Sequence, residues 1–423
     1  MRVLLRMSQA IALLAVVAAT PLHAETPGEI LRREIEAGHA AAAVDILRAQ
    51  GGAEARMAQG FAQFASSVEK LAQGFYRYGL RAPSNPFVPV ARMMLPENPR
   101  PAPLDYQTLR SLYQTFLDDL AEARKALTAF TADPASADTK IVLDLNAVRF
   151  SLAAPGTMPM PTISLGDIAG AGRQFQPRRP GQSAPPPFDP LPAWDVAFDR
   201  ADAFWLIGYT HILSATHEFI MAHDWHETFE ATGYLFFAGA RPPANIVQPD
   251  QRDPLAVMRS MASSVADQIA LLHLVHWPAG DKVRMSAARR HLKSAIAASR
   301  ETWKAILAET DDDREWLPSP RQQSRANPGM PITDEMVAGW LKVLDDFDDL
   351  LDGRKLLAHW RTAKGIDLKM FFEEPQPFDL VLWATGHASM PFLKDGPTID
   401  SNQWQLWQNL FRNNFLGYAI YIN

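Results

Sequence analysis

The sequence of 423 residues contains no cysteine. This absence excludes disulfide bonds, thiol catalysis, thiolate metal sites and attachment of a lipid through an N-terminal cysteine. The fold must therefore be held by its hydrophobic core. A chain of this length with 47% apolar residues is long enough to bury a large one.

The sequence also lacks the short motifs of several enzyme classes. It has no Gly-x-Ser-x-Gly nucleophile elbow, no phosphate-binding glycine loop and no dinucleotide-binding fingerprint, and its motifs identify no known family. The formal charge is −6, and no basic cluster is interleaved with aromatic residues, so we expect no nucleic-acid partner. Whether the protein is an enzyme stays open at this point.

No long apolar run follows the N-terminal segment. Residues 1–24 have the pattern of a secretory signal peptide: Arg2 and Arg6, an apolar stretch over residues 10–19, and the small residue Ala24 before an expected cleavage. The apolar stretch is shorter than the ~20 residues that a membrane span requires. We therefore expect a soluble mature protein without a transmembrane segment, periplasmic or secreted.

Most of the remaining chain has the 3.6-residue apolar periodicity of helices. The sequence predicts a mainly α-helical array or bundle with long proline-rich loops. Residues 141–152 alternate between apolar and polar positions, and residues 162–165 are a candidate partner strand, so we expect at most one short β-hairpin at about 141–165. The helices are expected at 28–80, 106–130, 198–237, 255–277, 286–308, 334–351 and 401–422.

The distribution of proline predicts the domain boundaries. After the signal peptide, residues 25–152 form an N-terminal helical region that ends in a strand. Residues 153–193 are rich in proline and glycine and are interpreted as a linker or crossing loop. Residues 194–423 then form a C-terminal helical core domain.

The stretch from Trp194 to Phe237 is expected to organise this core. Between residues 198 and 222 apolar side chains fall on all sides of a helical wheel, which is typical of a central helix, and Pro192 suits its first turn. Asp224 and Glu227 have the spacing of a capping box, which would end one helix near residue 223 and begin another. A continuous helix and a broken one both remain possible from the sequence.

Two groups of polar residues are candidate sites. His211 and Glu218 are seven residues apart, so they share a face of the central helix and are candidate binding residues. A second group has two His-x-x-His pairs and nearby carboxylates, whose spacing suits a divalent metal ion such as zinc. The candidate metal ligands are His223, His226, Glu227, Glu230, His273 and His276.

These features lead to two main hypotheses about function, beside a third in which the helices of residues 28–130 form a helical-repeat adaptor. The first is an exported binding or envelope-associated protein without catalytic activity, which holds an unidentified small molecule or protein in a groove between helices. The second is a metal-binding protein or metal-dependent hydrolase centred on residues 223–230, in which a carboxylate acts as base. A cofactor is not implied with certainty, although a divalent metal would suit the second hypothesis.

Overall fold

The computed structural model describes residues 24–81, 95–152, 162–164, 194–244 and 256–423. The described part of the chain is mainly α-helical, as predicted, and no helix in it is long and apolar enough to cross a membrane. The expected signal peptide and nearly all of the expected linker lie outside the described residues. The α-helices are α2 (Pro27–Glu36), α3 (Ala40–Arg48), α4 (Ala53–Arg77), α5 (Tyr106–Thr131), α7 (Arg200–Ala222), α8 (His226–Phe236), α9 (Ala256–Leu274), α10 (Lys282–Ala308), α11 (Asp334–Leu351), α12 (Leu368–Glu373), α13 (Leu380–Ala384), α14 (Ser401–Leu410) and α15 (Phe415–Ile422), with 3-10 turns η2 (Pro134–Asp138) and η3 (Met390–Phe392).

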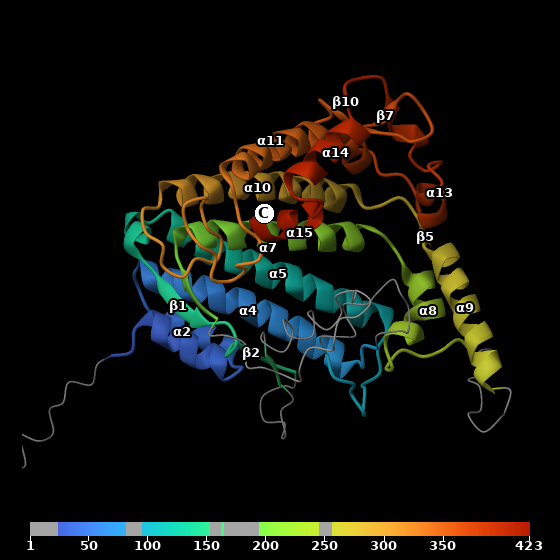
Figure 1. Ribbon diagram of the computed structural model, residues 1–423. Coiled ribbons are helices and arrows are strands. Elements are labelled where there is room, and N and C mark those ends of the chain that lie inside the picture. Colours follow the sequence, from blue (N-terminus) through green and yellow to red (C-terminus); the bar gives the residue numbers. More distant parts are fainter. Residues whose placement is uncertain (1–23, 82–94, 153–161, 165–193, 245–255) are drawn as a thin grey trace, which may run out of the picture.

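The long helices lie in successive rows, with α7 between α5 and α10 (Figure 1). Helix α7 runs antiparallel to α10, because His211 contacts His291 while Glu218 contacts Arg284. Helix α7 therefore has protein on several sides, which explains why its apolar residues do not form a single stripe. Helices α8 and α9 lie together at one end of this array, and α2 and α3 pack on α4.

The start of α7 differs from the sequence prediction. Residues 195–198 form strand β4 (Asp195–Phe198), and the helix begins only at Arg200, so the first turn is not at Pro192. The Asp199 side chain accepts from the amides of Ala201 and Asp202, while the Asp202 carboxylate accepts from the Asp199 amide. This reciprocal capping box satisfies amides that have no partner within the helix.

Of the two alternatives that the sequence left open after α7, the structure has the broken helix, but the predicted capping box at Asp224 is wrong. Helix α7 ends at Ala222 and α8 begins at His226, where the Asp224 carboxylate accepts from the His226 amide and from the Tyr106 hydroxyl. Arg110 of α5 donates to the carbonyls of Met221 and His223. The chain turns here because a side chain from another helix satisfies the last carbonyls of α7, which no local pattern could reveal.

The strands are more numerous than the single expected hairpin. Strand β2 (Arg149–Ser151) pairs with β3 (Thr162–Ser164) as expected, but β1 (Ile141–Asp144) pairs with β4, which precedes α7. Residues 355–399 contribute a small four-stranded sheet in the order β10-β6-β7-β9, and β5 pairs with β8. These strands are β5 (His276–Trp277), β6 (Leu356–Ala358), β7 (Gly365–Ile366), β8 (Phe378–Asp379), β9 (Leu393–Lys394) and β10 (Thr398–Ile399).

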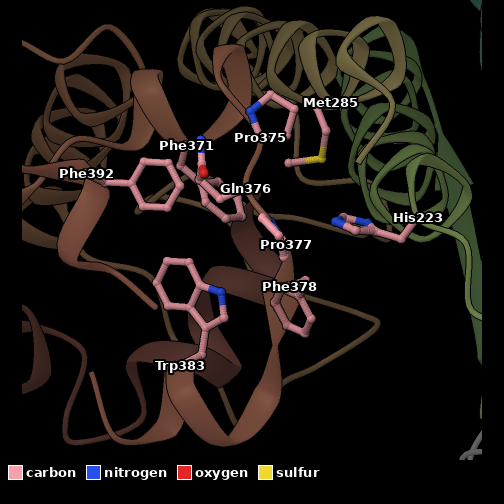
Figure 2. A pocket seen from close by; sticks show the side chains of 9 residues that line it. All are labelled: His223, Met285, Phe371, Pro375, Gln376, Pro377, Phe378, Trp383 and Phe392. Carbon is pink, nitrogen blue, oxygen red and sulfur yellow. The ribbon is translucent and has the colours of Figure 1, made fainter. Parts of the chain in front are cut away.

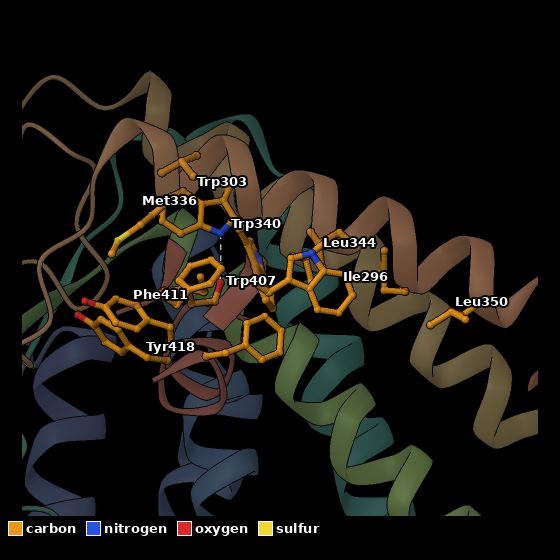
Figure 3. Close-up of a cluster of buried hydrophobic side chains, with 14 of the residues drawn as sticks. Ile296, Trp303, Met336, Trp340, Leu344, Leu350, Trp407, Phe411 and Tyr418 are labelled. Carbon is orange, nitrogen blue, oxygen red and sulfur yellow. Dashed lines mark hydrogen bonds between the residues drawn. The ribbon is translucent and has the colours of Figure 1, made fainter. Parts of the chain in front are cut away.

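The aromatic residues near the C-terminus are part of the core. The expected single helix is divided into α14 and α15, because Arg412 and Asn413 between them have left-handed backbone angles. Most of the stripe is nevertheless buried, and Figure 3 shows Trp407, Phe411 and Tyr418 among side chains of α10 and α11.

The last carbonyls of α15 are satisfied by side chains of other helices. Trp205 of α7 donates its ring N–H to the carbonyl of Tyr421 at 2.9 Å. Trp303 of α10 donates in the same way to Ile422 at 3.1 Å. Gly208 of α7 allows the close approach, since a Cβ there would lie 2.7 Å from Nδ2 of Asn423.

Candidate functional site

His223 lies where α7 ends and is only 2% exposed. Its Nδ1 is 2.8 Å from the carbonyl oxygen of Phe219, one helical turn earlier. A carbonyl oxygen can only accept, so Nδ1 carries the proton and Nε2 of the neutral ring has a free lone pair. Burial lowers the pKa of His223, which keeps the ring in this neutral form at physiological pH.

A small pocket opens beside this imidazole. Figure 2 shows His223 entering from α7 and Met285 from α10, while the other lining residues come from the segment around α12, α13 and η3. The enclosed cavity is about 10 Å³, and about 220 Å³ lies between the lining atoms when the open mouth and its solvent are included. The lining residues are His223, Met285, Phe371, Pro375, Gln376, Pro377, Phe378, Trp383 and Phe392.

The pocket wall is mainly aromatic, and its rings support one another. The ring centroids of Phe371 and Phe392 are 5.6 Å apart in an edge-to-face arrangement, and the ring of Trp383 stacks on that of Phe392 with centroids 6.0 Å apart. Phe378 lies 5.8 Å from the ring of His223. Among the described residues, Nε2 of His223 has no hydrogen-bond partner. A buried acceptor therefore opens onto an aromatic surface.

The other predicted metal ligands on α8 are on its exposed side. His226 and Glu230 lie one turn apart, with Nε2 of His226 3.7 Å from a carboxylate oxygen of Glu230. Glu227 is exposed as well, whereas His223 precedes the helix and is buried. The backbone turn at residues 223–225 thus separates His223 from the face that carries the other three.

His273 and His276 are not on one helical face, contrary to the sequence prediction. Helix α9 ends at Leu274, and His276 belongs to strand β5, which pairs with β8. Nδ1 of His276 is 2.8 Å from a carboxylate oxygen of Asp379, its partner in that pairing. His273 is exposed at the end of α9.

The predicted binding residues His211 and Glu218 face α10, each with a partner there. Nδ1 of His211 is 2.8 Å from Nδ1 of His291, and Glu218 accepts from Arg284 at 2.8 Å. Their placement on one face of α7 is as predicted. Their partners could not be foreseen, because residues some 70 to 80 positions apart show no joint pattern in one sequence.

Sequence reasoning missed a cluster of carboxylates where α7 begins and α10 ends. Ligand atoms of Asp199, Glu309 and Glu315 all lie within 4.8 Å of one another, the one such group of three or more in the described part of the chain. Oxygen ligands of this kind suit Ca²⁺ or Mg²⁺. Exposed acids often cluster without a metal, so the grouping alone assigns no ion. The metal site at 223–230 and 273–276 stays a prediction.

The carboxylates of this cluster hold protons more tightly than ordinary acids. Burial, with the charge of Asp199 next, raises the pKa of Glu309 to about 8, and burial raises the pKa of Glu315 to about 7. The pKa of Asp202, which shares the capping box with Asp199, is also raised, first by burial and then by the charge of Asp199. Close carboxylates in a poorly solvated place cannot all ionise without cost.

Comparison with known proteins adds no functional assignment. Protein-family models, curated proteins and solved structures gave no match to this chain. The functional argument therefore rests on the geometry of the chain itself.

Proposed function

We propose that the protein is an exported binding protein without catalytic activity, and that the His223 pocket holds a small ring-bearing molecule with one hydrogen-bond donor. The observation that carries this proposal is the free Nε2 lone pair of His223, buried at the edge of an aromatic pocket. A mostly apolar cavity with few convergent polar groups is the usual form of a small-molecule site. A hydrogen-bond donor on the ligand would pair with Nε2 of His223, which has no partner among the described residues.

The pocket chemistry favours binding over catalysis. His223 is the one titratable side chain among the nine lining residues, and its lowered pKa makes it a weak base. General acid–base catalysis depends on a group whose pKa lies near the working pH, and commonly on a partner that orients it. The other polar groups of the lining are the amide of Gln376 and the ring N–H of Trp383.

The size of the pocket limits the ligand. Drug-sized ligands occupy pockets of roughly 300–1,000 Å³, whereas the enclosed volume here is about 10 Å³, enough for about one water molecule. A single aromatic ring that donates one O–H or N–H suits the aromatic wall and the acceptor, and it enters when the side chains of residues 371–392 move apart. Phenol is the simplest probe of this kind, and toluene has nearly the same shape without the donor.

We expect calorimetric titration to show that phenol binds more tightly than toluene. The substitution His223→Phe keeps a ring but removes the acceptor, so phenol should bind about tenfold more weakly while toluene is unchanged, as for one hydrogen bond. His217→Phe is the matched control, because His217 makes the same bond to the carbonyl of Leu213 but does not line the pocket. Equal binding of the two probes, no binding of either, or equal effects of both substitutions would contradict the proposal.

Export is supported by the N-terminal sequence with its two arginines, short apolar stretch and small residue at Ala24. We expect the protein expressed in a bacterium to be recovered from the periplasm or medium with a new N-terminus near Glu25. N-terminal sequencing of the fractionated protein tests this, and an intact Met1 on cytoplasmic protein would contradict it.

A further inference from the structure

The interface of α5, α7 and α10 contains a half-buried arginine without a counter-ion. Nη1 of Arg124 lies 3.2 Å from Oγ1 of Thr210 and 3.4 Å from Oγ of Ser214. Within the described ranges, no carboxylate pairs with Arg124, and its Nε and Nη2 atoms have no acceptor. Half-buried arginines of α10, by contrast, do have acidic partners: Arg284 pairs with Glu218, and Arg289 pairs with Asp352.

Two neutral histidines lie beside this arginine. Nδ1 of His211 and Nδ1 of His291 are 2.8 Å apart, so one ring donates and the other accepts. Burial and then the charge of Arg124 lower the pKa of His211 to about 3 and that of His291 to about 4. The exposed Arg290 also lowers the pKa of His291. Because one Nδ1 of the pair accepts, that ring has an N–H at Nε2.

We propose that Arg124, His211 and His291 form a binding site for a tetrahedral oxyanion of the phosphate type, in which the buried hydroxyls of Thr210 and Ser214 hold the guanidinium in place. The guanidinium offers unused N–H groups in the planar arrangement that matches a phosphate group. The histidine pair offers one Nε2–H, on whichever ring accepts at its Nδ1. An anion here also supplies the counter-charge that a desolvated guanidinium lacks.

The surrounding charges favour an anion. The groups that face the histidine pair are Arg124 from α5 and Arg290 on α10, both positive. The nearest acid on the same face of α7 is Glu218, two turns away, and it is already paired with Arg284. Each of Arg124, His211 and His291 is only partly buried, so solvent and a small ion can reach them.

Isothermal titration of the full chain with inorganic phosphate, without other oxyanions in the buffer, tests this site. We expect saturable binding that Arg124→Gln weakens about tenfold or more, as for a lost charged hydrogen bond, and that Arg124→Lys partly restores. His291→Asn should weaken binding too, which keeps the test decisive if one variant does not fold. Arg300→Gln is the matched control, since Arg300 of the same α10 pairs with Asp345.

The pH dependence gives a second readout. A bound anion raises the pKa of both imidazoles from about 3 and about 4, so sulfate, whose charge is constant in this range, should bind more tightly as the pH falls from about 7 to about 5. Absence of saturable binding by the wild-type chain, or equal affinity in Arg124→Gln, would overturn the proposal. Phenol binding should be the same in Arg124→Gln and wild type, so the two proposed sites fail or hold independently.

Discussion

A double substitution of Glu309 and Glu315 by glutamine should flatten the fall in stability that we expect above neutral pH. In the folded chain the pKa of Glu309 is about 8 and that of Glu315 about 7, both raised from 4.5 by burial first. Above about pH 4.5, these two carboxyl groups therefore lose their protons in the unfolded chain but keep them in the folded chain. Stability is then lost as pH rises toward the folded pKa values.

The magnitude follows from proton linkage. Each unit of pKa difference corresponds to about 1.4 kcal/mol, so the two groups together should cost wild type about 3 kcal/mol between about pH 6.5 and pH 9. The four lowered histidines, His211, His217, His223 and His291, act in the opposite direction. Because they are half protonated in the unfolded chain at about pH 6.5, they add about 0.4 kcal/mol of stability each as pH rises from there, equally in wild type and double variant.

Urea unfolding at the two pH values, in the presence of a chelator, measures this effect. Between the two pH values, wild type should lose up to about 3 kcal/mol more stability than the double variant. Glu301→Gln is the control, because it makes the same chemical change on a partly exposed residue of α10. A wild-type stability that rises with pH, or equal slopes in wild type and double variant, would contradict the described cluster.

Removal of the Trp303 side chain should destabilise the protein by about 3–5 kcal/mol, as for a large core aromatic residue. Trp303 is 1% exposed, belongs to the cluster in Figure 3 and donates its ring N–H to the carbonyl of Ile422. Trp303→Ala therefore leaves a cavity and also an unpaired carbonyl where α15 ends. Trp303→Phe should cost less, about 1–3 kcal/mol, mainly because the carbonyl loses its donor.

Thermal and urea unfolding of these variants check the expectation. Trp360→Ala is the matched control, because Trp360 is 64% exposed and stacks only on the ring of His359. We expect it to change stability by no more than about 0.5 kcal/mol. Similar losses for Trp303→Ala and Trp360→Ala would show that α15 is not docked as described.

Local sequence patterns predicted the elements that depend only on residues close to one another in the sequence. The helix from Tyr106 and the one from Asp334 begin where the apolar periodicity placed them, and the structure shows Asp105 and Thr333 as their caps. The break between α7 and α8 was one of the two alternatives that the sequence left open. In each case the cause is a turn signal, a cap or a periodicity within a few residues.

The features that the sequence did not reveal depend on distant residues. Strand β4 forms because β1, about 50 residues earlier, pairs with it. The amphipathic pattern of residues 106–130 places Arg124 opposite the apolar side, but in the structure it contacts Thr210 and Ser214 of α7. The aromatic wall around His223 comes from residues 371–392, whose short apolar runs predicted no common site. Such contacts follow from packing and have no local signature.

The most direct test of the proposed ligand site is nitrogen-15 NMR of the histidine rings during titration with phenol. Before phenol is added, His223 should be neutral with the proton on Nδ1, because this atom donates to the Phe219 carbonyl. On saturation, the Nε2 resonance of His223 should shift as it accepts a hydrogen bond, while that of His217 stays in place. An Nε2 resonance of His223 that does not move with phenol, or that moves equally with toluene, would contradict the account.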